Sequence, residues 1–158
     1  QLNIREINLN EIIEIAFKLY EKSDHAKYKV FTLQLPENDI KVKSDKTLLI
    51  RCIGNLIKNA LEASEPKDPV KVYSYYNDEF AYINIFNNQV IPENVRLQLF
   101  QRSFSTKQSK GRGLGLYSVK LIIEQYLMGK VSFVTNEVFG TVFTIQLPLK
   151  FPEQEKTT

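Results

Sequence analysis

The amino-acid sequence predicts an α+β fold, a two-layer α/β sandwich in which about three helices cover one face of a mixed, mostly antiparallel sheet. Two observations predict this class: helical and strand-like segments are interspersed along the chain, and several strand-like segments lie close enough in sequence to pair. A chain of 158 residues can bury about two-thirds of its unfolded surface around one core. We therefore expect one domain over residues 1–150 and a disordered tail over residues 151–158.

The composition is that of a globular protein, with 43% hydrophobic and 25% charged residues. The net charge of +3 comes from scattered Lys and Arg residues, so we expect no nucleic-acid partner. No apolar run reaches the about 18 residues of a membrane span, so we expect no membrane contact by this part of the protein. The single cysteine, Cys52, excludes an internal disulfide, is expected in the core and fits a cytoplasmic compartment. Because the chain begins with Gln1, we expect a fragment of a longer protein, and membrane anchoring of that protein stays open.

The chain opens with an expected strand over residues 4–7 and an amphipathic helix over residues 10–22. Either Asn8 or Asn10 is expected to cap this helix, because both carry a side-chain oxygen that can accept from a free backbone N–H. The expected apolar face of the helix consists of Ile12, Ile15, Ala16 and Leu19.

A hairpin is expected next, with strands over residues 28–35 and 40–42 and a turn over residues 36–39 that contains Pro and Asn. The only histidine, His25, lies in a polar loop before the first of these strands, without a second residue for a metal site or a catalytic triad. We therefore interpret His25 as a surface residue.

The strongest helical pattern covers residues 45–64, and the Pro-containing segment after it ends the helix. Its polar stripe consists of Arg51, Asn55, Asn59 and Glu62, which are spaced three or four residues apart and so share one face. Its broad apolar face is expected to consist of Leu49, Cys52, Ile53, Leu56, Ile57, Ala60 and Ala63.

Two strand pairs are expected in the second half of the chain, at residues 70–76 with 80–87 and at residues 130–135 with 141–147. The two-residue alternation places Asn87 on the same side as Ile83 and Ile85, so this polar side chain needs a partner, of which a ligand is one candidate. The inner face of the last strand is expected to carry Phe143, Ile145 and Leu147. Between the pairs, a short helix is expected over residues 91–99.

Three of the six glycines occupy alternate positions, Gly111, Gly113 and Gly115, just before a helical pattern that begins at Leu116. Glycine-rich backbone followed by a helix N-terminus suits an anionic phosphate, whereas the alternative is a flexible surface turn. The apolar residues of the helix are expected to be Leu116, Val119, Ile123 and Tyr126.

The amides of Asn55 and Asn59 can ligate a hard cation or hydrogen-bond a phosphate, or they simply form a solvated polar face. Together with the glycine run, these amides indicate a metal-nucleotide pocket. In such a pocket the Asn59 amide oxygen would coordinate Mg²⁺, and phosphate oxygens would supply further ligands. Lys107 and Arg112 either neutralise the outer phosphates or are ordinary surface charges.

Four blocks of the sequence resemble the catalytic and ATP-binding domain of sensor histidine kinases, in the order found in that family. Residues 55–63 (NLIKNALEA) resemble its N box, residues 99–107 (LFQRSFSTK) its F box, residues 111–116 (GRGLGL) its second glycine box, and residues 140–148 (GTVFTIQLP) its closing strand. The resemblance implies the Bergerat fold that this family shares with gyrase, mismatch-repair and chaperone ATPases. It also implies ATP and Mg²⁺ as cofactors and a nucleotide lid over residues 104–110.

By this resemblance, Asn59 is the Mg²⁺ ligand, Asn55 and Lys107 are the catalytic residues, and Thr141 supports the adenine subsite. The residues expected to contact the nucleotide are Asn55, Asn59, Ala63, Asn87, Ile91, Thr106, Lys107, Gly111, Arg112, Gly113, Leu114, Gly115, Leu116 and Thr141.

The adenine box departs from the family pattern. The family has an Asp followed by two glycines, whereas this chain reads Asn87-Asn88-Gln89-Val90-Ile91-Pro92. The family Asp accepts a hydrogen bond from the adenine amino group, and an Asn oxygen can also accept one. The absence of glycines supports the alternative function, a degenerate, non-catalytic nucleotide-binding or protein-interaction module.

The resemblance implies a two-component sensor histidine kinase that delivers the γ-phosphate of Mg-ATP to a histidine. The expected partners are a histidine-containing dimerisation domain of the same protein and the receiver domain of a response regulator. The ATPase relatives carry a glutamate as general base where this chain has Asn55, which cannot take a proton at neutral pH. Phosphotransfer is therefore favoured over hydrolysis.

Overall fold

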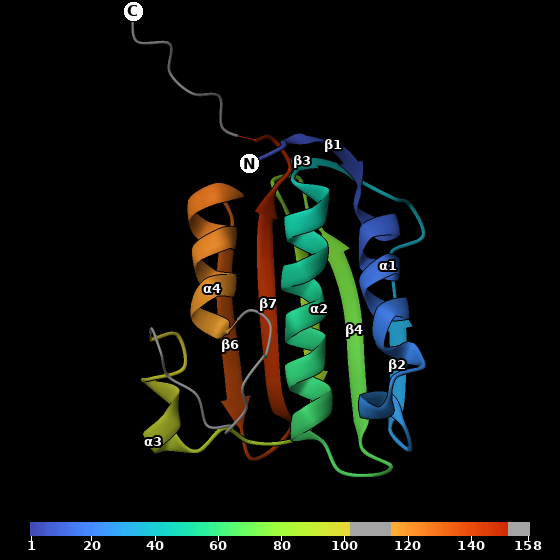
Figure 1. Cartoon of the computed structure of the whole chain (residues 1–158), viewed down its shortest axis with the longest axis vertical. Helices are drawn as coiled ribbons and strands as arrows, with labels where there is room; N and C mark the ends of the chain where they lie inside the picture. Colours follow the sequence, from blue (N-terminus) through green and yellow to red (C-terminus); the bar gives the residue numbers. More distant parts are fainter. Residues whose placement is uncertain (102–114, 152–158) are drawn as a thin grey trace, which may run out of the picture.

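The fold was analysed in a computed structural model, which describes residues 1–101 and 115–151. A five-stranded sheet forms one layer, in the order β2 (Val30–Gln34), β4 (Pro69–Tyr76), β5 (Phe80–Asn87), β7 (Gly140–Pro148) and β6 (Lys130–Asn136). Strands β2 and β4 are parallel, and all other neighbours in this sheet are antiparallel. Helices α1 (Leu9–Glu21), α2 (Lys46–Ala63) and α4 (Leu116–Leu121) lie on one face of the sheet (Figure 1). The predicted fold class is thereby confirmed.

The predicted hairpin between residues 28–35 and 40–42 is wrong. Strand β3 (Lys41–Ser44) pairs instead with β1 (Arg5–Asn8) in a separate two-stranded antiparallel sheet. The connection between β2 and β3 is bound to the start of α1, because Leu9 N donates to Ile40 O at 2.9 Å and Asn10 Nδ2 donates to Pro36 O at 3.0 Å. These long-range bonds hold the turn-like segment away from β2.

Helix α1 turns a different face inward from the one predicted. Ile12 and Ala16 are buried as expected, but Leu19 is 62% exposed and Ile15 is only half-buried. Ile13 and Phe17 are buried in their place, and the Phe17 ring stacks on Phe31 of β2 at 4.1 Å between centroids, which rotates the inward face toward the edge of the sheet. A 3₁₀ turn, η1 (Asp24–Ala26), follows the helix.

Helix α2 forms at the predicted position. Asp45 is its N-cap, and Asp45 Oδ1 accepts a hydrogen bond from Leu48 N at 3.0 Å. Ala63 was placed on the apolar face, but it is exposed because the helix ends there and the chain leaves the core. The buried residues of the helix are Leu49, Cys52, Ile53, Gly54, Leu56, Ile57, Ala60 and Leu61.

Helix α4 continues into one π-helical turn, η2 (Ile122–Tyr126). Val119 and Ile123 are buried as predicted, Leu116 is half-buried and Tyr126 is 48% exposed. The π turn has one more residue than an α turn, with Leu127 N donating to Ile122 O, so Leu127 is buried in the position expected for Tyr126.

The two predicted antiparallel pairs in the second half of the chain, β4 with β5 and β6 with β7, are both present. The expected inward side chains are buried, namely Ile83, Ile85, Asn87, Phe143, Ile145 and Leu147. Helix α3 (Glu93–Arg96) ends before the expected Leu99, because Gln98 N and Gln101 N bond three residues back in separate turns. Within residues 1–101 and 115–151, no helix is both long and apolar enough to cross a bilayer.

Candidate functional site

The described candidate residues gather at one edge of the sandwich. Asn59 lies near the C-terminal end of α2, Asn87 ends β5 and Thr141 lies at the start of β7, and the lower edge in Figure 1 contains these ends of α2 and β7. Gly115 precedes α4, whose first turn lies higher in the same view and points toward this edge. Asn87 and Thr141 are direct partners in the antiparallel ladder. Because α2 packs against both β5 and α4, residues distant in sequence are brought to this one edge.

Two half-buried amides, Asn55 and Asn59, lie one turn apart on the polar side of α2, where their oxygens suit a hard cation. Glu62, farther along the same stripe, lies 3.9 Å from Lys58 Nζ and 4.0 Å from His25 Nδ1. His25 is therefore part of the surface, as expected, but beside an acidic partner that the sequence did not indicate. No group of three or more His, Cys, Asp or Glu residues that could hold a metal occurs in the described ranges.

The side chain of Asn87 is 5% exposed, and Asn87 Oδ1 accepts a hydrogen bond from Gln89 N at 2.9 Å. The sequence identified Asn87 as an inward polar residue that needs a partner, and the following loop supplies one. This Asx turn folds residues 87–89 back over the end of β5 without using a glycine.

The loop after Asn87 is fixed by hydrogen bonds from two strands, β6 and β7. Thr141 Oγ1 donates to Gln89 O at 2.6 Å and lies 2.8 Å from Thr135 Oγ1, and Ile91 N donates to Thr135 Oγ1 at 3.0 Å. Thr141 is fully buried. Thr141 therefore fixes the position of the loop backbone, and its role beside a nucleotide base stays a prediction.

Asp68, just before β4, is a site residue that the sequence reasoning missed. Asp68 Oδ1 accepts from Asn88 Nδ2 at 3.1 Å, and Asp68 Oδ2 accepts from Gln89 Nε2 at 3.0 Å and Glu65 N at 2.8 Å. The hydrogen bond from Glu65 N and the one from Asn88 lower the pKa of the Asp68 carboxyl. The signal was present: since Val70 pairs with Asn87, continuing the antiparallel register places Asp68 beside Gln89.

Gly140 provides space for this loop from the opposite strand. Its φ is +112°, and a Cβ at this position would lie 2.4 Å from Asn87 O and 2.6 Å from Asn88 Cα. Only glycine tolerates this combination of a positive φ and a close backbone approach. The glycine that this close approach requires therefore lies in strand β7 beneath the loop and not in the loop itself.

The start of α4 is described only from Gly115 onward. Gly115 is the N-cap, with a φ of −73°, and no atom of the described residues lies within 4 Å of a Cβ built on it. Leu116 is half-buried. The other predicted phosphate and lid contacts lie outside the described residues: Thr106, Lys107, Gly111, Arg112, Gly113 and Leu114.

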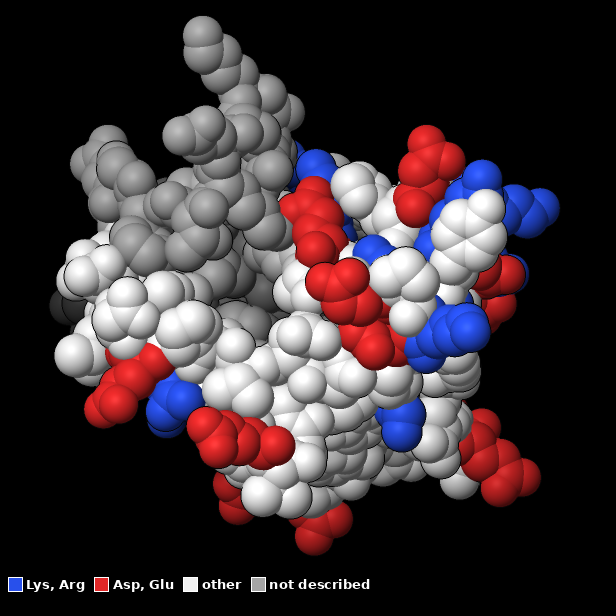
Figure 2. Space-filling model, turned by 90° about the horizontal axis from the view of Figure 1, so that it is seen from below, with Lys and Arg blue, Asp and Glu red and all other residues white. Residues whose placement is uncertain are grey.

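The charges around this edge are mixed in sign. Figure 2 views the molecule from this side, and its acidic and basic side chains are interspersed among a larger number of uncharged ones.

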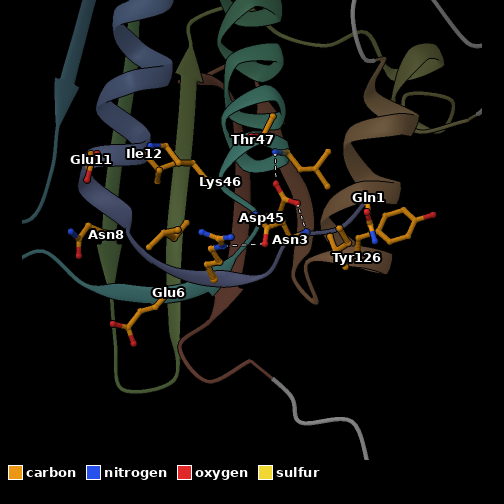
Figure 3. A pocket seen from close by; sticks show the side chains of 14 residues that line it. Gln1, Asn3, Glu6, Asn8, Glu11, Ile12, Asp45, Lys46, Thr47 and Tyr126 are labelled. Atoms are coloured by element: carbon orange, nitrogen blue, oxygen red, sulfur yellow. Dashed lines mark hydrogen bonds between the residues drawn. The ribbon is translucent and has the colours of Figure 1, made fainter.

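A cavity of about 970 Å³ lies at the opposite edge, between the N-terminal segment and the first turns of α1 and α2, with Tyr126 at its margin (Figure 3). Asp45 connects the N-terminal segment to α2 at this cavity. Its Oδ2 accepts a hydrogen bond from Asn3 N at 2.8 Å, and its Oδ1 caps α2. Asn59 is about 20 Å from this end of α2, at 1.5 Å per residue. The cavity and the candidate site are therefore separate.

Residues 44–151 match the family model described as histidine kinase-, DNA gyrase B-, and HSP90-like ATPase. The curated relatives include a probable C4-dicarboxylate sensor kinase of Halalkalibacterium halodurans, which is 38% identical over 65% of this chain and 20% of its own length. Sporulation kinase B of Bacillus subtilis is 30% identical over 90% of this chain and 34% of its own length. The chain thus spans about a fifth to a third of these two relatives.

The solved structures give the same result over almost the whole chain. The catalytic domain of histidine kinase ThkA, in a nucleotide-free form, superposes with a TM-score of 0.82 at 28% identity, covering 95% of this chain and 99% of that domain. The family model and the solved structures therefore indicate the same family. The chain belongs to the histidine kinase-, DNA gyrase B- and HSP90-like ATPase family, and within it resembles the histidine kinase catalytic domains.

Proposed function

We propose that this domain binds Mg-ATP at the edge formed by α2, β5 and β7 and delivers the γ-phosphate to a histidine on a separate dimerisation domain of the same protein. The observation that carries the proposal is the convergence of Asn59, Asn87 and Thr141 from three elements onto one edge. In this arrangement, Asn59 would hold Mg²⁺ through its amide oxygen, and Thr141 would position the base-side loop. The bound Mg²⁺ would supply neutralisation of phosphate charge.

Transfer to histidine, rather than hydrolysis, is supported by the chemistry of Asn55. An amide has no basic lone pair near neutral pH, so it cannot activate water, but it can still hydrogen-bond a phosphate oxygen. In the transfer, the acceptor imidazole nitrogen bonds to the γ-phosphorus as the bond to the bridging oxygen breaks, and ADP leaves. The phosphate would then pass to the receiver domain of a response regulator. ThkA, a structural neighbour at 28% identity, has been solved in complex with a response regulator protein, TrrA.

The first experiment is calorimetric titration of the domain with a non-hydrolysable ATP analogue, with and without Mg²⁺. We expect binding that Mg²⁺ strengthens, and Asn59→Ala should remove most of this strengthening. Asn38→Ala is the matched control, because Asn38 is an exposed asparagine in the loop between β2 and β3. Absence of binding at millimolar nucleotide would contradict the proposal.

A second experiment separates the kinase from the non-catalytic module, which the glycine-free loop at residues 87–91 still favours. The domain is mixed with its histidine-bearing dimerisation domain and γ-labelled ATP. Label on the histidine supports the kinase, whereas nucleotide binding without transfer supports the module. Release of free phosphate by the domain alone would instead indicate a hydrolysing ATPase.

A further inference from the structure

The orientation of the Asn87 side chain has a consequence for which purine base the site accepts, and this inference rests on the proposed nucleotide site. Asn87 is 5% exposed, and its Oδ1 accepts from Gln89 N at 2.9 Å. A backbone N–H needs an acceptor, so the oxygen branch of the amide faces the loop and the NH₂ branch faces the other way. The hydrogen-bond network, rather than electron density, assigns this orientation.

Several contacts keep Gln89 in place and so prevent the amide of Asn87 from flipping. Gln89 O accepts from Thr141 Oγ1 at 2.6 Å, and Gln89 Nε2 donates to Asp68 Oδ2 at 3.0 Å. The loop backbone also packs closely on Gly140, because a Cβ there would lie 2.4 Å from Asn87 O and 2.6 Å from Asn88 Cα. A flip would place the NH₂ group against Gln89 N–H and lose a hydrogen bond at a buried position.

The other half of the Asn87 amide, the NH₂ group at Nδ2, is a hydrogen-bond donor. Among the described residues, Asn87 Nδ2 has no hydrogen-bond partner. A donor pairs with an acceptor on a base edge, and a 6-oxopurine presents a carbonyl oxygen where adenine presents an amino group, itself a donor. A carboxylate at the same position would only accept, and would favour the amino group.

We propose that Asn87 is a specificity-determining residue that lets the base subsite accept 6-oxopurine nucleotides at least as well as adenine nucleotides. The substrate class of the domain thereby widens from ATP to purine nucleoside triphosphates with an oxygen at position 6. Asp68 and Thr141 act as positioning residues, because they fix Gln89 and, through it, the amide of Asn87.

The test compares the dissociation constants of Mg-ITP and Mg-ATP for the 158-residue chain by calorimetry. Inosine is the suitable probe because its base lacks the extra 2-amino group of guanine. We expect a ratio of Kd for ITP to Kd for ATP of one or less, and we expect Asn87→Asp to raise this ratio by about tenfold or more, as expected for one exchanged buried hydrogen bond.

Asn77→Asp is the matched control. Asn77 forms the same kind of turn, with Oδ1 accepting from Glu79 N and Phe80 N, but between β4 and β5 at the opposite edge. This variant should leave the ratio unchanged, and circular dichroism should show that both variants are folded.

Two results would overturn the inference while leaving the nucleotide site in place. The first is a wild-type chain that binds ATP at least threefold more tightly than ITP. The second is an Asn87→Asp variant whose ratio of Kd for ITP to Kd for ATP differs less than threefold from the wild-type ratio. Absence of binding of both nucleotides removes the nucleotide site as well. The two failures are therefore distinguishable.

Discussion

Substitution of Gly140 by alanine tests whether the base-side loop depends on the strand beneath it. A Cβ at residue 140 would lie 2.4 Å from Asn87 O and 2.6 Å from both Asn88 C and Asn88 Cα, all backbone atoms that cannot rotate away. The φ of +112° adds backbone strain of about 1–3 kcal/mol, and overpacking adds about 1–3 kcal/mol. We expect a loss of about 2–6 kcal/mol in the free energy of unfolding.

Thermal unfolding measures this loss. Because about 1 kcal/mol shifts the midpoint of a domain this size by about 2–4 °C, Gly140→Ala should melt about 4–24 °C below wild type. Gly115→Ala is the matched control, since residue 115 has a φ of −73° and open space around its Cβ position. Replacing an N-cap glycine by alanine should cost less than about 1 kcal/mol. A Gly140→Ala protein that melts no lower than Gly115→Ala would refute the argument.

Three further substitutions test other parts of the fold. Asp45→Ala should lower the free energy of unfolding in urea by about 1–2 kcal/mol, because Leu48 N loses its cap and Asn3 N its acceptor, and Asp45→Asn should restore part of it. Burial raises the pKa of the Cys52 thiol to about 12, whereas an unfolded thiol ionises near pH 9. Between pH 9 and 12 the wild type should therefore lose up to about 1.4 kcal/mol of stability per pH unit relative to Cys52→Ala, and parallel pH profiles would exclude this. Thr141→Val, which keeps the shape but removes the donor to the loop carbonyl, should cost about 1–3 kcal/mol in thermal unfolding, and Thr141→Ser should recover most of it.

Local signals explain why α2 and the antiparallel pairs could be predicted from the sequence. Asp45 as an N-cap and the helical spacing of apolar residues define α2 without help from the rest of the chain. In the β4–β5 hairpin, Asn77 accepts two backbone hydrogen bonds across the turn, so the turn residue itself specifies the register. Asn87 could be placed inward because it follows Ile83 and Ile85 at two-residue intervals along β5.

The sequence-based predictions failed where contacts between residues distant in sequence determine the local structure. Residues 36–40 have the composition of a hairpin turn, but they bond to the start of α1. Asp68 and Gln89 are 21 residues apart, so only the register of the hairpin between them reveals their contact. Tyr126 faces solvent because of a π turn, which apolar spacing at 3.6 residues does not anticipate. The glycine-rich phosphate contacts stay predictions.

The parallel pairing of β2 with β4 determines the order in which the sheet can assemble. Val30 pairs with Pro69, 39 residues away, whereas Tyr76 pairs with Ala81 across a short turn. Closing the longer loop costs about 2 kcal/mol more in chain entropy. The β4–β5 hairpin can therefore form first, and β2 joins it later, once α2 has shortened the connection. Because β2 is also an edge strand, its amide protons should exchange with solvent deuterium before those of β4 and β5 in the native protein.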